Sequence, residues 1–287
     1  MSISRGVIFF LAGSTLSVGV LTAGAFWFGL QGLLLRQRTP ARVSPQWTDL
    51  GPTPMGEKGF TPQGMTWVGK RLIFANTWKN ERSRIYEYDP DGMRILRHFD
   101  MPAGAVHTSG LAWDGKHLWG VDYITNRAYC MDLEKSLADG RVAEVGSFDT
   151  TLKGTSASAF VPFEGGHVLA ISDFMHSRRT IFVKPQDALK AKSAKGHIVF
   201  SYRNGGFSQG LEYVNGFLYE SENKLGIDVI NKIDLALLQA AGNARQATVA
   251  QISGPSKGIE DLAWDGKEFL YTSDESTFRF YKTCLAH

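Results

Sequence analysis

One pattern of residues returns five times along the 287-residue chain, and it restricts the fold more than any other feature. Each copy holds an apolar strand, a turn containing glycine, most often as Asp-Gly or Asn-Gly, and a second apolar strand. Such a turn between two apolar runs is the strongest local signal for a β-hairpin. The spacing of about fifty residues is typical of β-propeller blades. The copies span 63–76, 109–122, 157–172, 209–222 and 260–273.

Two further strands are expected in most copies, with short helix-forming runs such as DALKAKSA and ALLQAAGNA between them. The fifth copy has no fourth strand, because too few residues follow Lys282. Trp47–Pro52 precedes the first copy and is expected to supply that strand, since circular propellers close by joining their two ends. The predicted fold is therefore an all-β, five-bladed β-propeller over residues 47–287. A β-sandwich, the main rival, does not predict five aligned hairpins.

An apolar segment precedes the predicted propeller. No charged side chain occurs from Gly6 to Leu35, and this length is sufficient to cross a membrane as a helix. A cleavable signal peptide ending near Ala23–Ala25 is the alternative, but the apolar residues continue past it, which favours an uncleaved anchor. We expect a membrane anchor over 1–36, a linker over 37–46, and a single-pass membrane protein whose propeller is periplasmic or extracellular.

Composition excludes several classes of function. The formal net charge is +3 with acidic and basic residues interspersed, so no basic stripe for nucleic acid is expected. Cys130 and Cys284 match no metal-binding spacing, and we expect them not to form a disulfide. No pair of histidines has the spacing of metal ligands, and neither a P-loop nor a nucleophile elbow is present. We therefore expect neither a metal nor a cofactor.

Polar residues recur at two positions of the repeat, at the start of its first strand and at the end of its second. Because the innermost strands of a propeller line the central channel, these residues are expected at one mouth, where a peptide or small molecule would bind. Capping of strand ends and turns is the ordinary explanation for any single one of them, His107 included. The two sets are Gln63, Ser109, Gln209 and Glu260, and Asn76, Asp122, Ser172, Glu222 and Ser273, with Asp173 and Asp274 one step further.

Glu220 departs from the repeat. The other copies have Phe74, Gly120, Ala170 and Tyr271 at this position. If the side chain faces packed neighbours, loss of hydration would raise the pKa of its carboxyl group toward neutrality, as a general acid or base requires. If it faces the outside of the blade, it is an ordinary surface residue, because side chains alternate along a strand.

The stretch FSQGLEYVNGFLYESENKLG, from Phe207 to Gly226, resembles the glutamine cyclotransferases of plants and bacteria, whose first blade typically reads FTQGL, a turn, and a strand with ES. Those enzymes are five-bladed propellers that convert N-terminal glutamine to pyroglutamate and release ammonia without a metal. The resemblance implies that Glu220 is the acid/base, that Gln209 lies in the pocket, and that Phe207 lies at its rim. In this chain the motif stands in the fourth copy rather than the first.

A second stretch, IFANTWKNERSRIYEYD, is similar to a blade of the same family that contains ANxW, and this similarity implies that Asn76 and Trp78 lie near the substrate. Gln63 and Glu260 are added as candidate binding residues from their place at the channel mouth. Three functions stay open at this point. They are a glutaminyl cyclase, a propeller that binds a ligand or protein without catalysis, and a lactonase-like hydrolase whose metal would be held by oxygen ligands from Asn76, Asp122, Asp173, Glu220 or Asp274.

Overall fold

A computed structural model describes residues 39–53, 60–224 and 228–285. The expected anchor over 1–36 lies outside these residues. Within the described residues, no helix combines the length and the apolar character needed to cross a membrane.

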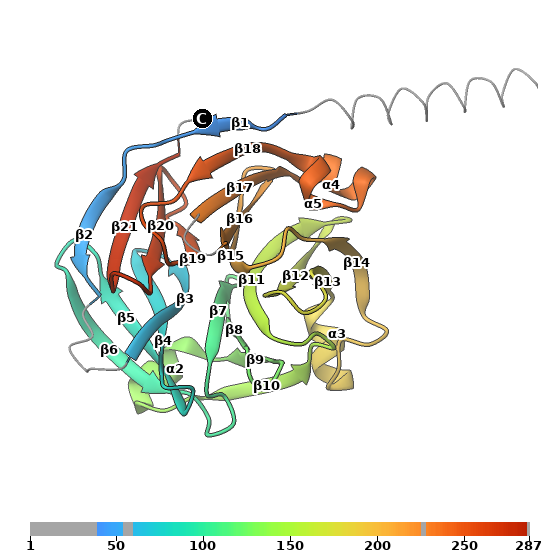
Figure 1. The fold of residues 1–287 in the computed structure, drawn as a ribbon. Helices are drawn as coiled ribbons and strands as arrows, with labels where there is room; N and C mark the ends of the chain where they lie inside the picture. Colours follow the sequence, from blue (N-terminus) through green and yellow to red (C-terminus); the bar gives the residue numbers. More distant parts are fainter. Residues whose placement is uncertain (1–38, 54–59, 225–227, 286–287) are drawn as a thin grey trace, which may run out of the picture. The chain divides into compact units, whose positions relative to one another are not determined.

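The described strands form five sheets around a common centre (Figure 1). Blade 1 contains β3 (Phe60–Val68), β4 (Arg71–Trp78), β5 (Arg82–Asp89) and β6 (Arg94–Asp100). Blade 2 contains β7 (Thr108–Trp113), β8 (Leu118–Asp122), β9 (Arg127–Met131) and β10 (Glu144–Asp149). Blade 3 contains β11 (Thr155–Phe163), β12 (Gly166–Asp173), β13 (Arg179–Val183) and β14 (Ile198–Arg203).

Blades 4 and 5 complete the ring. Blade 4 contains β15 (Ser208–Val214), β16 (Phe217–Asn223), β17 (Asp228–Asp234) and β18 (Thr248–Ser253). Blade 5 contains β19 (Ile259–Trp264), β20 (Phe269–Asp274) and β21 (Arg279–Cys284), and its fourth strand is β2 (Thr48–Pro52). The prediction of a five-bladed propeller is confirmed, and β2 closes the ring by pairing antiparallel with β21.

The segment expected as a linker contributes a strand of its own. β1 (Ala41–Val43) pairs in parallel with the outer edge of β18, so blade 4 has five strands. The amino-terminal part of the propeller therefore holds blade 4 through β1 and blade 5 through β2. A covered edge is less open to pairing with other chains than a free one.

Four short helices lie between the third and fourth strands of blades 2, 3 and 4, as the helix-forming runs predicted. They are α2 (Leu133–Asp139), α3 (Pro185–Ala191), α4 (Leu235–Ala241) and α5 (Ala244–Ala247). Asp132 caps α2 by accepting a hydrogen bond from the amide of Lys135, and Asp234 caps α4 in the same way through Leu237.

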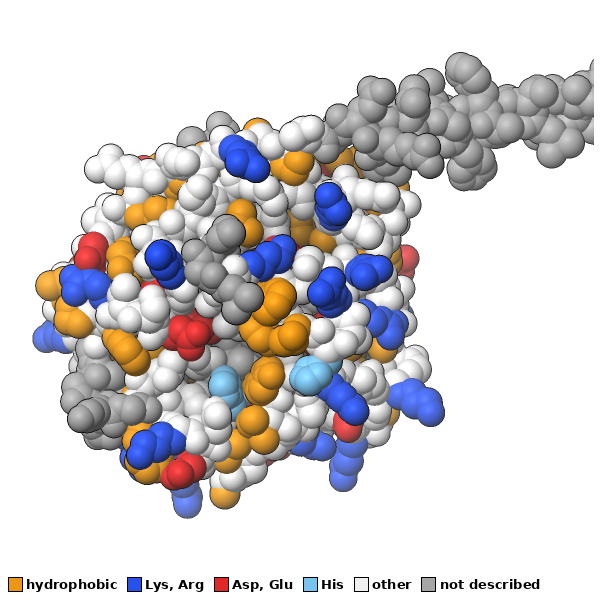
Figure 2. All heavy atoms as spheres, viewed as in Figure 1, with side chains coloured by type: hydrophobic (Ala, Val, Ile, Leu, Met, Phe, Trp, Pro, Cys, Tyr) orange, Lys and Arg blue, Asp and Glu red, His pale blue; other side chains and the backbone are white. Residues whose placement is uncertain are grey.

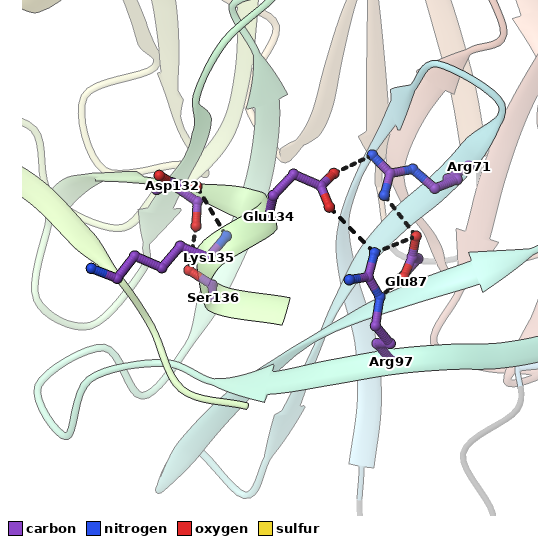
Figure 3. Close-up of polar contacts among 7 residues, drawn as sticks. All are labelled: Arg71, Glu87, Arg97, Asp132, Glu134, Lys135 and Ser136. Carbon is purple, nitrogen blue, oxygen red and sulfur yellow. Dashed lines mark hydrogen bonds and ion pairs between the residues drawn. The ribbon is translucent and has the colours of Figure 1, made fainter. Parts of the chain in front are cut away.

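An ion-pair network ties blade 1 to α2 of blade 2 (Figure 3). Arg71 donates to Glu87 at 2.7 Å and to Glu134 at 2.6 Å, and Arg97 donates to the same two carboxylates. Although burial raises the pKa of Glu87, the hydrogen bonds from Arg97 and Arg71 lower it below its ordinary value. These ion pairs hold α2 against blade 1, which is a structural role, and we do not treat them as a candidate site.

Apolar side chains fill the spaces between neighbouring blades. Leu111 of blade 2, for example, packs with Ile73 of blade 1, and Leu211 of blade 4 packs with Ala159 of blade 3. Cys130 is buried in blade 2 and Cys284 is exposed in blade 5, and neither forms a disulfide.

The five innermost strands meet closely at the axis. A Cβ atom on Gly110 would lie 2.7 Å from the amide nitrogen of Ser158, and one on Gly210 would lie 2.5 Å from the Cα of Asp261. Asp261 is fully buried there and accepts four hydrogen bonds from backbone amides of blades 1, 2, 4 and 5. The donors are Met65, Leu111, Leu211 and Leu262. Asp261 therefore joins the innermost strands of these four blades.

Candidate functional site

β-Bulges occur near the start of all five innermost strands. In blade 4, Ser208 pairs with Glu222 and Gly210 pairs with Ser221, so Gln209 has no partner of its own. The registers of β3, β7, β11 and β19 shift at the corresponding places. A bulge redirects a side chain away from the regular alternation and is common beside functional sites. The first set of polar residues thus stands on irregular backbone at one mouth of the channel.

Three of the polar residues at the ends of second strands have structural roles. Asp122 accepts hydrogen bonds from the amides of Ile124 and Thr125, and Asp173 accepts them from Ser177 and Arg179. Asp274 binds the following turn in the same manner. These aspartates order the turns that lead into the third strands of blades 2, 3 and 5, as the capping explanation predicted.

Glu220 has no such role. Its side chain on β16 is fully buried, and neither carboxylate oxygen has a hydrogen-bond partner among the described residues. The hydroxyl groups of Tyr202 and Ser208 are also buried without a partner there. A buried polar group without a partner costs about 1 to 3 kcal/mol of folding free energy, and a charged one costs more. The folded state therefore gains no stability from the Glu220 carboxyl group.

Burial, followed by repulsion from Glu222, raises the pKa of Glu220 to about 8, and the nearby Ser208 hydroxyl and Lys224 ammonium oppose this shift only in part. Burial and the Glu220 carboxyl also raise the pKa of Tyr202. Glu222 forms an ion pair with Lys224. Blade 4 thus places a carboxyl group with a raised pKa beside the ion pair of Glu222 and Lys224. Such a pair is suited to proton transfer.

Gln209 contacts Glu260 rather than Glu220. Its amide nitrogen donates to Glu260 at 3.1 Å. Burial, followed by repulsion from Glu275 and further nearby carboxylates, raises the pKa of Glu260 well above its ordinary value. The predicted binding residues Gln209 and Glu260 therefore lie together, between blades 4 and 5.

Glu220 is separated from Gln209 and Glu260 because it lies on the face of β16 that points away from blade 5. Ser221 donates a hydrogen bond to the Glu260 carbonyl, so it faces blade 5. Because side chains alternate along a strand, Glu220 faces the other way, toward Tyr202 of blade 3.

An arc of four ring side chains borders the same mouth. The ring centroids of His107 and Tyr123 lie 5.2 Å apart, those of Tyr123 and Phe174 lie 6.4 Å apart, and those of Phe174 and Phe207 lie 5.4 Å apart. The Phe207 amide also donates to the Phe174 carbonyl. The arc spans blades 2, 3 and 4, and Phe207 is its only member among the predicted site residues.

Gln63 stands beside this arc. Its amide oxygen lies 2.8 Å from Nε2 of His107, whose Nδ1 lies 2.5 Å from the amide oxygen of Asn80. Burial lowers the pKa of His107 despite the opposing charge of Asp122. A neutral His107 can donate to only one of these two oxygens, and a flip of the Asn80 amide, which exchanges its oxygen and nitrogen, would present its NH₂ group to the other ring nitrogen.

Asn76 and Trp78 occupy blade 1, and no contact joins them to Glu220 among the described residues. Asn76 is fully buried, and both polar atoms of its amide lack a partner within that part of the chain. Trp78 lies against two basic side chains, with Lys79 at 4.9 Å and Arg82 at 5.3 Å from its ring centroid. Trp78 therefore packs with its own blade.

The oxygen ligands considered for a hydrolase do not converge. Asp122, Asp173 and Asp274 serve three separate turns, and Asn76 and Glu220 lie in other blades. Within the described residues, no three His, Cys, Asp or Glu side chains form a group that could hold a metal ion.

Sequence reasoning missed Tyr123 and Phe174. Each directly follows a capping aspartate, Asp122 or Asp173, and the repeat alignment carries this signal as an aromatic residue one step beyond the second strand. In Figure 2, hydrophobic side chains gather near the middle of the face shown, and Lys and Arg are scattered across it without forming one continuous stripe.

Comparison with solved structures agrees with the architecture. The fold is similar to the crystal structure of Myxococcus xanthus glutaminyl cyclase, with a TM-score of 0.62 and 12% sequence identity over 86% of this chain and 100% of that chain. At this identity the similarity shows the shared five-bladed propeller fold.

Two other structures are less similar. The β-propeller domain of Myceliophteria thermophila Cps50 (Swd1) gives a TM-score of 0.44 at 10% identity, covering 79% of this chain and 97% of that one. A mitotic checkpoint complex chain gives 0.42 at 13% identity, covering 76% of this chain and 59% of that one. No family model and no curated protein sequence matches the chain.

Proposed function

We propose that the protein is a glutaminyl cyclase, with Glu220 as the group that transfers the proton. The observation that carries this proposal is the buried, unpartnered carboxyl of Glu220, which occupies the place of the family's acid/base glutamate in the FSQGL and ES motif. The fold shared with the Myxococcus xanthus glutaminyl cyclase supports it.

The reaction joins the α-amine nitrogen of an N-terminal glutamine to its own side-chain amide carbon. The new carbon–nitrogen bond closes the lactam ring, the amine loses a proton, and the departing amide nitrogen gains one and leaves as ammonia. Glu220 accepts and donates a proton with a pKa of about 8, which lies close to working pH. Glu222, held by Lys224, provides a carboxylate beside it.

The proposal requires that part of the protein move to give a substrate access to Glu220. Glu220 has no exposed surface, so a substrate must displace part of its cover. A Cβ atom on Gly205 would overlap Glu222, which shows how tightly the turn before β15 packs on this pair of carboxyl groups. Phe207 in the same turn has a φ of 61°, a conformation that favours glycine. This turn is the segment expected to move.

The test measures ammonia release from a peptide with N-terminal glutamine. We expect the wild type to release ammonia and Glu220→Gln to lose about 10²- to 10⁴-fold in kcat/KM, as is typical for loss of a general acid or base. Glu144→Gln makes the same change at an exposed position of β10 and should leave the rate unaltered. Absence of ammonia release from the wild-type protein would remove the proposal.

A propeller that binds a peptide without catalysis is the second candidate. The contact between Gln209 and Glu260 favours it, because the Gln209 amide is then paired within the protein. The arc of His107, Tyr123, Phe174 and Phe207 would then be the binding surface. Binding of the glutaminyl peptide with no ammonia release from wild type would identify this function.

We further propose that the propeller is exported and tethered through the apolar segment from Gly6 to Leu35. Protease treatment of spheroplasts, in which the outer layers are removed and the cytoplasmic membrane is intact, tests this directly. An exported propeller is cut without lysis of the spheroplasts, whereas one that is cut only after lysis would contradict the proposal.

A further inference from the structure

Three buried polar side chains lie between blades 3 and 4. The hydroxyl of Tyr202, the hydroxyl of Ser208 and both carboxyl oxygens of Glu220 have no hydrogen-bond partner among the described residues. None of the three side chains is more than 2% exposed. Buried polar groups without a partner are rare, and each one requires an explanation. The proposed function explains Glu220, but it does not explain the two hydroxyl groups.

The topology brings these groups together. Tyr202 is the last residue but one of β14 and Ser208 begins β15, so the two flank the turn that joins blade 3 to blade 4. On β16, Glu222 pairs with Ser208, and Glu220 stands two residues before it. Leu218 lies on the same face of β16 as Glu220, and it belongs to the apolar cluster that contains Tyr202. Tyr202 and Glu220 therefore face the same layer between the two blades.

The residue beside Tyr202 in the sheet is already engaged. Thr180 pairs with Tyr202 across β13 and β14, but its hydroxyl pairs with that of Ser172 at 2.5 Å and accepts a bond from Asn204 at 3.4 Å. Burial, followed by the charge of Glu220, raises the pKa of Tyr202 well above its ordinary value, and the Thr180 hydroxyl opposes this shift only in part. Tyr202 thus keeps its proton at working pH and is available as a donor.

Glu220 needs such a donor only while it transfers a proton. As a neutral acid it brings no charge into the interior. After it has lost its proton it is a buried carboxylate, which is strongly disfavoured unless donors reach it. Besides burial, Glu222 and Asp173 disfavour this second negative charge, and Lys224, which favours it, is already paired with Glu222. Two hydroxyl groups without partners are the donors that remain.

We propose that Tyr202 is a positioning residue whose hydroxyl donates to the Glu220 carboxylate when that group has given up its proton, with Ser208 as a second donor. The inference rests on the proposed role of Glu220 as the group that transfers the proton. A hydrogen bond to the charged form of an acid favours that form. The bond from Tyr202 therefore holds the carboxylate in one orientation and keeps the pKa of Glu220 from rising further above about 8.

The test follows the titration of Glu220 itself. The full-length chain is isotopically labelled at the side-chain carboxyl carbons of its glutamates, and the NMR signal that is missing from Glu220→Gln identifies Glu220. Tyr202→Phe removes only the hydroxyl. We expect it to raise the midpoint of the Glu220 titration by about one to two pH units, the effect of one hydrogen bond to a charged group. An unchanged midpoint in the folded variant would overturn the proposal.

Tyr219→Phe is the matched control. Tyr219 is a buried tyrosine next to Glu220 on β16, but it packs in the apolar cluster between blades 4 and 5, on the other face of the strand. Loss of its hydroxyl should leave the Glu220 midpoint unchanged, and a rise equal to that in Tyr202→Phe would contradict the assignment. Ser208→Ala removes the second donor and should also raise the midpoint. Thermal melting monitors the fold of each variant.

The pH dependence of activity gives a second readout. Because Glu220 must be ionised to accept the proton of the amine, the acid limb of kcat/KM should move to higher pH in Tyr202→Phe by the same amount as the NMR midpoint. A tyrosine with only a structural role would lower the rate equally at every pH, and that result would contradict the proposal. If the wild type releases no ammonia but the midpoint still rises in Tyr202→Phe, the cyclase is removed and Tyr202 stands as the partner of Glu220.

Discussion

Blades 4 and 5 each bury a carboxyl group near the end of their second strand, and the two groups have opposite surroundings. Asp274 accepts hydrogen bonds from Gly258, Ser276 and Thr277, among others, whereas Glu220 accepts none among the described residues. Both are 0% exposed. Both groups lack exposed surface, and their contacts differ in the supply of hydrogen-bond donors.

The pKa values of the two groups follow from this difference. Although burial raises the pKa of Asp274, hydrogen bonds from Ser256, Ser276 and Thr277 lower it below its ordinary value. Glu220 has no comparable compensation, and its pKa rises to about 8. Asp274 thus stabilises the turn between β20 and β21, while Glu220 is a group that the fold does not need. Unsatisfied groups of this kind are more common at functional sites.

Asp261 offers the largest test of the comparison, because its buried carboxyl group accepts hydrogen bonds from four backbone amides. Asp261→Leu would leave four buried amides without an acceptor. At about 1 to 3 kcal/mol for each unsatisfied group, we expect a loss of at least about 4 kcal/mol in the free energy of unfolding, measured with urea. Asp261→Asn retains one oxygen and should lose less. An unchanged urea midpoint in Asp261→Leu would show that the axis does not depend on this carboxylate.

Asp274→Ala should give the next largest effect. The substitution leaves the buried amide of Gly258 and the turn amides of Ser276 and Thr277 without their acceptor. We expect a loss of about 2 to 3 kcal/mol by urea denaturation at pH 7. Because the pKa of Asp274 is lowered in the folded state, its contribution is present above its ordinary pKa and is lost as pH falls further. A loss that persists unchanged at low pH would contradict this role.

Glu220→Met should raise the free energy of unfolding, whereas the two substitutions above lower it, and the change should be smaller. The substitution replaces an unpartnered buried carboxyl by an apolar side chain of similar length. We expect a gain of about 1 to 2 kcal/mol in the free energy of unfolding at pH 7, together with loss of any ammonia release. Destabilisation of this variant would mean that Glu220 makes a structural contact and that the contrast with Asp274 is wrong.

Much of the fold could be predicted because it is encoded locally. The glycine turns within each hairpin, such as Asn215–Gly216, and the repeated spacing fix five blades, and the missing fourth strand of blade 5 points to Trp47–Pro52. The pairing of β1 with β18 could not be predicted, because this short, exposed strand has no apolar alternation and its partner is distant in sequence.

The candidate site was only partly predictable, for a different reason. Glu220 stands out from the repeat in the sequence itself, and the capping role of Asp122 follows from its residue type. The bulge at Gln209 depends on the register of its partner strand, which the sequence of one strand does not specify. The position of Gln209 against Glu260, rather than beside Glu220, follows from that bulge and from the alternation along β16.

The most direct measurement compares the free energy of unfolding of wild type with that of Glu220→Gln between pH 5 and pH 8. The pKa of Glu220 rises from an ordinary 4.5 to about 8 on folding, so its protonated form is favoured in the folded state. The stability that the folded state gains by binding this proton is fully present below the ordinary pKa of 4.5. It is lost as pH rises through the folded-state pKa of about 8. We predict that wild type loses up to about 1.4 kcal/mol per pH unit relative to Glu220→Gln over this range. A difference that stays constant from pH 5 to pH 8 would contradict the central claim that Glu220 is a neutral, unpartnered acid.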